Sequence, residues 1–269
     1  MLARWIARVS SAARIKVDLS MTVPWIIGAA AAGILAGPGI RAIVFLRSTA
    51  AGQPSRRDCP ACDHVLLAAG RPWRWALPVT GRCRACQRRI GPLPLAVELC
   101  CAAALGIVAF RATSIWELAA FGWFVLLAIP LACIDVAVYR LPDILTITAA
   151  IGSIALLTGA ALTAGHPARL GRVLLGAAVL SGCFLALLLV APNSMGLGDA
   201  KLGVSTGAVL AWVSWQTLLT GALGAFLLAG LYSGALIAMR RATAATPVPM
   251  GMFIVAGAVA AILLGPVRL

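Results

Sequence analysis

The stretch IWELAAFGWFVLLAIPLACIDVAVYRLPD at residues 115–143 decides the class of fold. Its first part, residues 115–134, is almost wholly apolar and matches the roughly 20 helical residues that cross a hydrocarbon core of about 30 Å. Backbone groups in lipid need hydrogen-bond partners within their own segment, so this run must be a helix. We therefore expect a transmembrane helix here, with Asp135 at its end.

Similar apolar runs recur along most of the chain. Of its 269 residues, 62% are hydrophobic and only 11% are charged, whereas about 25% are charged in an average soluble domain. This composition excludes an ordinary soluble fold, and we expect an all-α polytopic membrane protein with about eight transmembrane helices. These helices are predicted at residues 23–46, 93–111, 115–134, 144–164, 172–191, 200–216, 217–238 and 250–268.

The one sizeable polar insertion, residues 47–92, carries nine arginines and two aspartates. Positively charged loops stay on the cytoplasmic side, so we expect this loop to be cytoplasmic. Helices that alternate in direction then place Asp135 and Asp199 on the same cytoplasmic face. This topology places Arg169, Arg172 and the basic residues 1–20 on the opposite face, which the same rule disfavours. We let the loop set the topology because its positive charge is denser.

The chain divides into three parts at this loop: residues 1–46, residues 47–92 and the membrane-embedded residues 93–269. The first part begins like the charged region of a signal peptide. Its apolar run is too long for one and has no convincing small-residue cleavage site, so we expect a retained first helix.

The formal net charge of +14 arises partly because the chain has only eight acidic residues. A basic loop between apolar runs indicates attraction to anionic lipids, which we expect as partners. We expect no nucleic-acid partner. A nucleic-acid-binding loop on an inert membrane anchor remains the weakest alternative.

Four cysteines form two pairs in the polar loop, Cys59-Pro-Ala-Cys62 and Cys83-Arg-Ala-Cys86, with twenty residues between them. This spacing predicts a structural Zn²⁺ site of four thiolates, which would order a loop that is too small to fold unaided. Two disulfides are the alternative, disfavoured in a reducing compartment. His64 is a further possible ligand, but we expect it to be solvated. Four other cysteines are expected to be buried as small apolar residues: Cys100, Cys101, Cys133 and Cys183.

Two aspartates lie at the predicted membrane boundary, Asp135 and the Asp199 of Gly196-Leu197-Gly198-Asp199. A carboxylate near hydrocarbon is costly and indicates function. Two carboxyls held close share a proton, so one can activate water while the other polarises a peptide carbonyl, as in aspartic proteases. The glycines leave room for substrate backbone or a neighbouring helix. A helix-entry turn capped by Asp199 would also explain this motif.

Three further charged residues have less specific interpretations. Asp143 follows Pro142, where we expect a helix N-cap. Lys201 is expected to extend toward lipid headgroups or to tune the Asp199 carboxylate. Glu98 is expected to favour the positive end of its helix or to neutralise Arg41.

Together these patterns admit an alternative of another class. A transporter or channel could use Asp135 and Asp199 as a proton or cation relay, with the cysteine loop as a regulatory domain.

Four stretches resemble the type IV leader peptidases, the bifunctional prepilin peptidases of type IV pili and type II secretion. They are the cysteine loop running on to Ile90-Gly91-Pro92-Leu93-Pro94-Leu95-Ala96-Val97-Glu98-Leu99, Asp135 with Arg140-Leu141-Pro142-Asp143, Gly196-Leu197-Gly198-Asp199-Ala200-Lys201-Leu202, and Val248-Pro249-Met250-Gly251-Met252-Phe253. One departure concerns the end of the first helix. The family usually has Asn and then Arg-Leu-Pro there, and this chain has Gly37-Pro38-Gly39-Ile40-Arg41 and Leu46-Arg47-Ser48.

This resemblance implies a GxGD-type aspartyl endopeptidase of the inner membrane, with its active site at the cytoplasmic face. It would remove the basic leader of prepilins or pseudopilins, cutting after a Gly just ahead of a hydrophobic helix. The catalytic pair would be Asp135 and Asp199, supported by Gly196, Gly198, Lys201 and Asp143, with zinc on Cys59, Cys62, Cys83 and Cys86. The resemblance also implies N-methylation of the new N-terminus with S-adenosylmethionine, associated with residues 47–92, and peptidase activity in residues 93–269.

Overall fold

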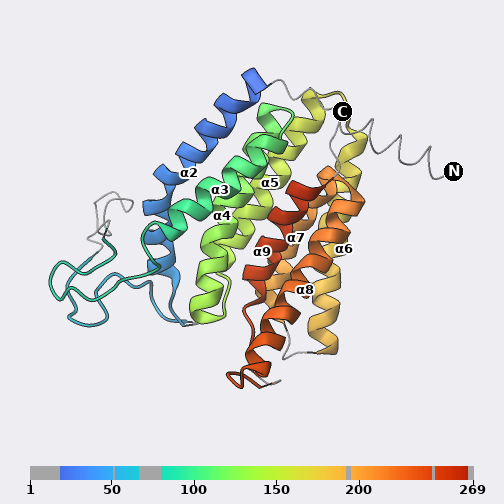
Figure 1. Cartoon of the computed structure of the whole chain (residues 1–269). Coiled ribbons are helices and arrows are strands. Elements are labelled where there is room, and N and C mark those ends of the chain that lie inside the picture. Colours follow the sequence, from blue (N-terminus) through green and yellow to red (C-terminus); the bar gives the residue numbers. More distant parts are fainter. Residues whose placement is uncertain (1–18, 51, 67–79, 192–194, 244–245, 266–269) are drawn as a thin grey trace.

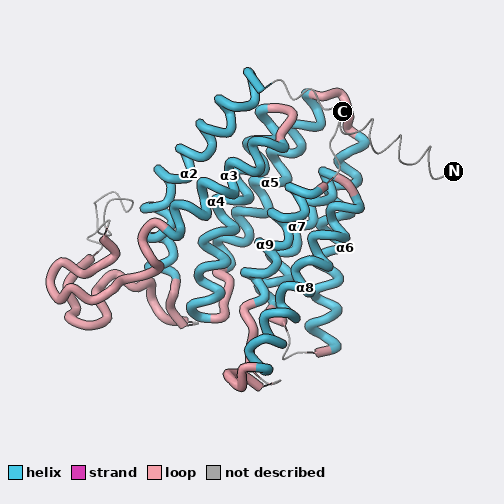
Figure 2. Tube along the Cα trace, viewed as in Figure 1, coloured by secondary structure: helices cyan, strands magenta, loops and turns pink. Residues whose placement is uncertain are grey.

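The computed structural model describes residues 19–50, 52–66, 80–191, 195–243 and 246–265, and the basic residues 1–18 lie outside this part. Eight helices form the described structure, and it contains no strand (Figures 1 and 2). They are α2 (Leu19–Arg47), α3 (Ala96–Arg111), α4 (Ile115–Val138), α5 (Asp143–Thr163), α6 (Ala168–Val190), α7 (Leu197–Val213), α8 (Trp215–Ala238) and α9 (Met250–Leu264). The expected all-α fold is therefore confirmed.

Five of these helices are long and apolar enough to cross a membrane, namely α2, α4, α5, α6 and α8. The chain is thus a multi-pass membrane protein. The other three are shorter, since α3 has 16 residues, α7 has 17 and α9 has 15. At 1.5 Å per residue these helices reach only about 22–26 Å, which is less than the hydrocarbon core.

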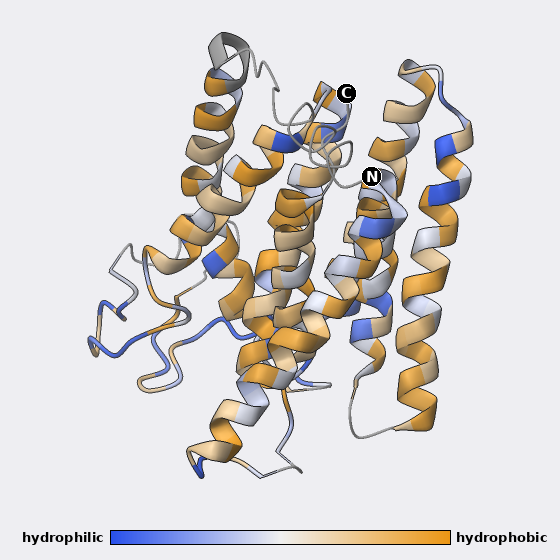
Figure 3. Cartoon of the chain, turned by 45° about the vertical axis from the view of Figure 1, so that its right-hand side comes forward, coloured by the Kyte–Doolittle hydropathy of each residue, from blue (hydrophilic) through white to orange (hydrophobic). Residues whose placement is uncertain are grey.

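Hydrophobic residues make up most of every helix (Figure 3), and many large apolar side chains are exposed on the outside of the bundle, where a soluble protein would be polar. Ile151 on α5, Leu189 on α6 and Leu223 on α8 are each more than 60% exposed. Lipid tails are the solvent that makes this surface favourable.

Glycines allow the main helix pairs to pack closely. A Cβ on Gly33 of α2 would lie 2.7 Å from the backbone of α3, and one on Gly257 of α9 would lie 2.6 Å from the Gly221 carbonyl of α8. Gly176 and Gly207 bring α6 and α7 together in the same way. Because lipid removes the hydrophobic drive between helices, small residues at the contacts stabilise the bundle through van der Waals packing.

A polar cluster surrounds Trp212 in the last turn of α7, at the opposite end of this helix from Asp199. The indole of Trp212 donates to Oε1 of the buried Glu117 at 2.8 Å. Arg172 donates to the Trp212 carbonyl at 2.8 Å, and the Arg169 guanidinium lies 5.5 Å from the indole centroid. These contacts give a structural reason for two arginines on the face opposite the basic loop.

Candidate active site

The two predicted aspartates lie at the same end of the bundle, as expected, where α4 ends and α7 and α9 begin (Figure 1). Asp135 is in the last turn of α4 and does not end the helix, which continues to Val138 before Tyr139 adopts a left-handed conformation. The helix extends past Asp135 because no proline or glycine lies between Asp135 and Pro142.

Each carboxyl is buried and accepts a hydrogen bond from a backbone amide. Oδ2 of Asp135 accepts from Gly251 at 2.8 Å, and Oδ2 of Asp199 accepts from Gly196 at 3.0 Å. The interpretation of Asp199 as a capping residue is therefore confirmed for this oxygen. Its Oδ1 is buried without a hydrogen-bond partner among the described residues. The two carboxyls are close enough to repel each other when both are ionised.

Leu141, in the turn between α4 and α5, explains why position 198 is a glycine. A Cβ on Gly198 would lie 2.7 Å from the Leu141 Cβ, and one on Gly251 would lie 3.3 Å from its Cδ2. The close neighbour expected at Gly198 is thus this leucine. A Cβ on Gly196 would find its nearest atom, the Asp199 Oδ2, at an ordinary 3.6 Å.

Asp143 and Lys201 form an exposed ion pair of 2.6 Å that joins α5 to α7 near the aspartates. The expectation that Asp143 caps a helix is wrong, because Pro142 holds the N-cap position and Asp143 begins α5 without a side-chain cap. Lys201 contacts this carboxylate instead of extending freely, since a nearby opposite charge is available.

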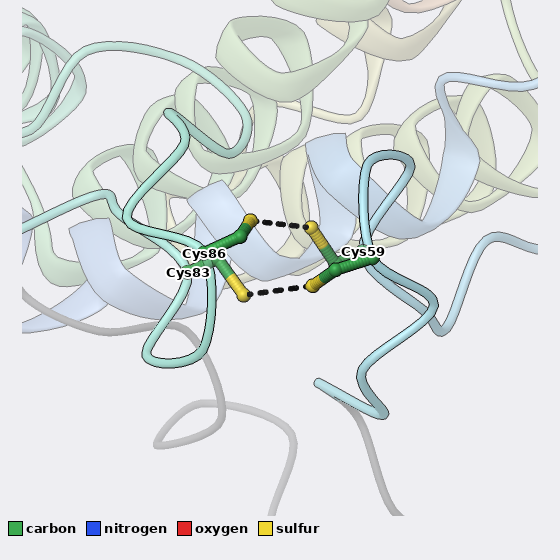
Figure 4. Close-up of side chains that lie close together, drawn as sticks. Cys59, Cys83 and Cys86 are labelled. Carbon is green, nitrogen blue, oxygen red and sulfur yellow. Dashed lines mark hydrogen bonds between the residues drawn. The ribbon is translucent and has the colours of Figure 1, made fainter.

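The four loop cysteines converge into one cluster, in which all ligand atoms lie within 4.8 Å of one another. The sulfur of Cys59 lies 3.7 Å from that of Cys86, and Cys62 and Cys83 are separated by the same distance (Figure 4). All four are free thiols, and the cluster does not include His64. Four sulfurs at 2.3 Å from a tetrahedral Zn²⁺ lie about 3.8 Å apart, so the residues fit this ion.

The two cysteine pairs have the same local fold, which places their sulfurs face to face. The amide of Cys59 donates to the His64 carbonyl at 2.9 Å, and the amide of Cys83 donates to Arg88 at 2.8 Å. Backbone amides of Cys86 and Ala85 lower the pKa of the Cys83 thiol to about 6. One thiolate is thus already favoured, as a metal site requires.

The cysteine loop rests on the last turns of α2. Cys59, Cys83 and Ile90 pack against Ala42 and Phe45 in a small apolar cluster that is separate from the main core. The loop is therefore positioned by its own core and by the first helix.

Below the loop, Arg41 of α2 and Glu98 of α3 form a buried ion pair of 3.2 Å. The interpretation that Glu98 neutralises Arg41 is confirmed.

The expectation for the other four cysteines holds for Cys101 but is wrong for Cys100 and Cys183, which are exposed on helix faces. Their faces are apolar but point away from the core, and sequence periodicity in a membrane helix does not separate the two cases.

Sequence reasoning gave no role to two residues that build this region. They are Gly251, whose amide binds Asp135, and Leu141, which packs against the starts of α7 and α9. The signal that marks both is a motif proline within two residues, Pro249 for Gly251 and Pro142 for Leu141.

Comparison with known proteins agrees with this arrangement. The model of the Type IV leader peptidase family matches residues 120–264. A prepilin leader peptidase/N-methyltransferase of Aeromonas salmonicida is 31% identical over 210 residues, which cover 74% of this chain and 68% of that protein. The protein of the same name from Pseudomonas aeruginosa is 29% identical over 209 residues, 73% of this chain and 67% of the relative. No solved structure matches. The chain therefore belongs to the type IV leader peptidase family.

Proposed function

We propose that the protein is a membrane aspartyl endopeptidase that removes the basic leader from prepilin-like proteins. One observation carries this proposal: two buried carboxyls, from α4 and α7, lie at one end of a membrane bundle, each held by a backbone amide. The names of the relatives in Aeromonas salmonicida and Pseudomonas aeruginosa support the same activity. Nothing among these relatives supports the transporter alternative.

The proposed reaction uses water directly, without a covalent bond between enzyme and peptide. The ionised carboxyl takes a proton from water while the water oxygen attacks the scissile carbonyl, and the protonated carboxyl gives its proton to the carbonyl oxygen. The C–N bond then breaks as a proton passes to the leaving amine. The unpartnered Oδ1 of Asp199 is the oxygen we assign to hold the attacking water.

The backbone amides of Gly196 and Gly251 have a positioning role in this scheme. Each holds one oxygen of its aspartate, and the Oδ1 of Asp199 is left to the reaction. Gly198 allows Leu141 to pack between the starts of α7 and α9, and the Asp143–Lys201 pair joins α5 to α7 beside them.

The proposed domains follow from these positions: residues 47–92 form a zinc-ordered loop, and residues 93–269 form the peptidase. Four thiolates leave no open position on a tetrahedral ion, so the metal would be structural. We place the loop and both aspartates on the cytoplasmic side of the inner membrane, because the loop is rich in arginine. Anionic headgroups would then bridge this basic enzyme and a basic leader.

N-methylation of the new N-terminus with S-adenosylmethionine is part of the proposal because the relatives carry it in their names. The sequence holds no glycine-rich nucleotide loop, and we assign no residue to this step.

The test is a mass measurement on a prepilin-like substrate incubated with the purified protein in lipid, with and without S-adenosylmethionine. Loss of the leader mass supports the peptidase, and an added methyl mass supports the second activity. An intact substrate in the presence of folded protein would contradict the proposal.

A further inference from the structure

A groove of about 800 Å³ lies between α2–α3 on one side and α4–α9 on the other. Its walls are almost entirely apolar, with Ser48 and Arg56 as the polar exceptions at the end next to the cysteine loop. Much of the wall is alanine, contributed by α3, α4 and α9. These alanines are Ala96, Ala103, Ala104, Ala132, Ala137 and Ala256.

The groove leads to the proposed active site. Val136 and Ala137, which line it, directly follow Asp135, and Met252 directly follows Gly251, whose amide binds Asp135. One end of the groove is therefore lined by the residues next in the chain to Asp135 and to its partner Gly251.

The length of the groove corresponds to part of the bilayer. Along α3 its wall runs from Ala96 to Ile107, which at 1.5 Å per residue is about 16 Å, or about half of the hydrocarbon core. An α-helix of about 10 residues has this length. Alanine walls allow another helix to approach closely, as small residues do between membrane helices.

We propose that this groove binds the apolar segment of the substrate that follows the scissile bond, as a helix of about three turns. This proposal rests on the proposed function. A lipid chain is the other apolar occupant, but residues next in the chain to Asp135 and Gly251 line this end of the groove, and the Asp135 charge would disfavour a phosphate beside it. Arg56 at that end already stacks on Phe45, 5.8 Å from the ring centroid. A peptide brings neutral backbone to the carboxyls.

The proposal predicts that filling the groove weakens the binding of substrates that carry the apolar segment. Ala103→Trp and Ala256→Trp place bulk in the groove from its α3 and α9 walls, and both positions are exposed enough for the protein to fold. Ala178→Trp, on an exposed face of α6, is the matched control.

Each variant is assayed on a full-length membrane substrate and on a short peptide with the same leader and scissile bond but without the apolar segment. We expect KM for the full-length substrate to rise at least about tenfold in both groove variants with kcat within about twofold, since only ground-state binding is lost. Cleavage of the short peptide and the behaviour of Ala178→Trp should not change. An unchanged KM, or equal losses on both substrates, would overturn the proposal.

A photocrosslinking residue gives an independent readout. It is placed at position 103, or at 178 as control, in the Asp199→Asn variant so that substrate is held without being cut. A crosslink from position 103 to the apolar segment is expected, and a crosslink to phospholipid alone would assign the groove to lipid. If the parent protein cuts neither substrate, the proposed function fails. If it cuts both but position 103 forms no crosslink to the apolar segment, only the groove assignment fails.

Discussion

The backbone amide of Gly251 donates a 2.8 Å hydrogen bond to Oδ2 of Asp135, which lies 116 residues earlier in the chain. This bond joins the first turn of α9 to the last turn of α4 and fixes one oxygen of a buried carboxyl. The C-terminal stretch therefore acts on the proposed active site directly, although it contains no titratable side chain.

Gly251→Ala should lower cleavage without unfolding the protein. The new Cβ would lie 3.0 Å from the Asp135 Oδ2 and 3.3 Å from Leu141, so the carboxyl must move by a few tenths of an ångström. Because small misplacements of a catalytic group are costly, we expect kcat to fall about tenfold. Gly224→Ala is the control, since its Cβ would meet its nearest atom at an ordinary 3.9 Å. Equal kcat values in the two variants would argue against a positioning role for Gly251.

The two glycines before Asp199 should differ in their tolerance of alanine. A Cβ on Gly198 would lie 2.7 Å from the Leu141 Cβ, whereas one on Gly196 would meet nothing closer than 3.6 Å. We expect Gly198→Ala to lower the free energy of unfolding by about 1–3 kcal/mol, because the added methyl group overpacks the contact with Leu141. We also expect kcat to fall. Gly196→Ala should retain activity within about threefold, because the amide that binds Asp199 is kept. A larger loss of stability and activity in Gly196→Ala than in Gly198→Ala would contradict this packing.

Breaking the Arg41–Glu98 pair should destabilise the protein far more than breaking the Asp143–Lys201 pair. The first pair is buried, and Glu98→Gln removes the carboxylate that pairs with the buried Arg41, which typically costs about 3–5 kcal/mol. The second is exposed, so Asp143→Asn should cost about 0–1 kcal/mol. Thermal unfolding in one detergent compares the two. Similar melting temperatures for both variants would show that the buried pair is not needed for stability.

Zinc content tests the cysteine cluster. We expect about one Zn²⁺ per chain in the parent protein, a loss of bound metal in Cys83→Ser, and no loss in His64→Ala, since the cluster excludes His64. Cleavage should fall less than methylation in Cys83→Ser, because the loop packs on α2 in its own apolar cluster. Elemental analysis and product masses measure both effects. Full metal binding by Cys83→Ser would rule out the four-thiolate site.

Much of this architecture is readable from the sequence because the membrane simplifies it. Apolar runs predict every described helix, since each run must satisfy its own backbone hydrogen bonds in lipid. The spacing of Cys59, Cys62, Cys83 and Cys86 predicts the cluster, because two closely spaced cysteine pairs are typical of a tetrahedral zinc site. The location of Asp135 and Asp199 at the same end of the bundle follows from the alternating directions of the helices after the basic loop.

The contacts that orient the side chains are not readable in this way. Nothing in the sequence around Asp143 separates an N-cap from an ion pair with Lys201, because that choice depends on α7 lying beside α5. The hydrogen bond from Gly251 to Asp135 has the same origin, since it comes from a main-chain group in a distant segment. The exposed Cys100 and Cys183 differ from Cys101 only in which apolar side of a helix they occupy.

The most direct test of the central claim is cleavage of a prepilin-like substrate in lipid vesicles by the parent protein and by Asp135→Asn and Asp199→Asn. Asn keeps the size of each side chain but removes the proton exchange on which the reaction depends. The account predicts loss of the leader mass with the parent and an intact substrate, with at least about a thousandfold lower rate, for each variant. Full cleavage by a folded Asp135→Asn or Asp199→Asn protein would contradict the assignment of this pair as catalytic.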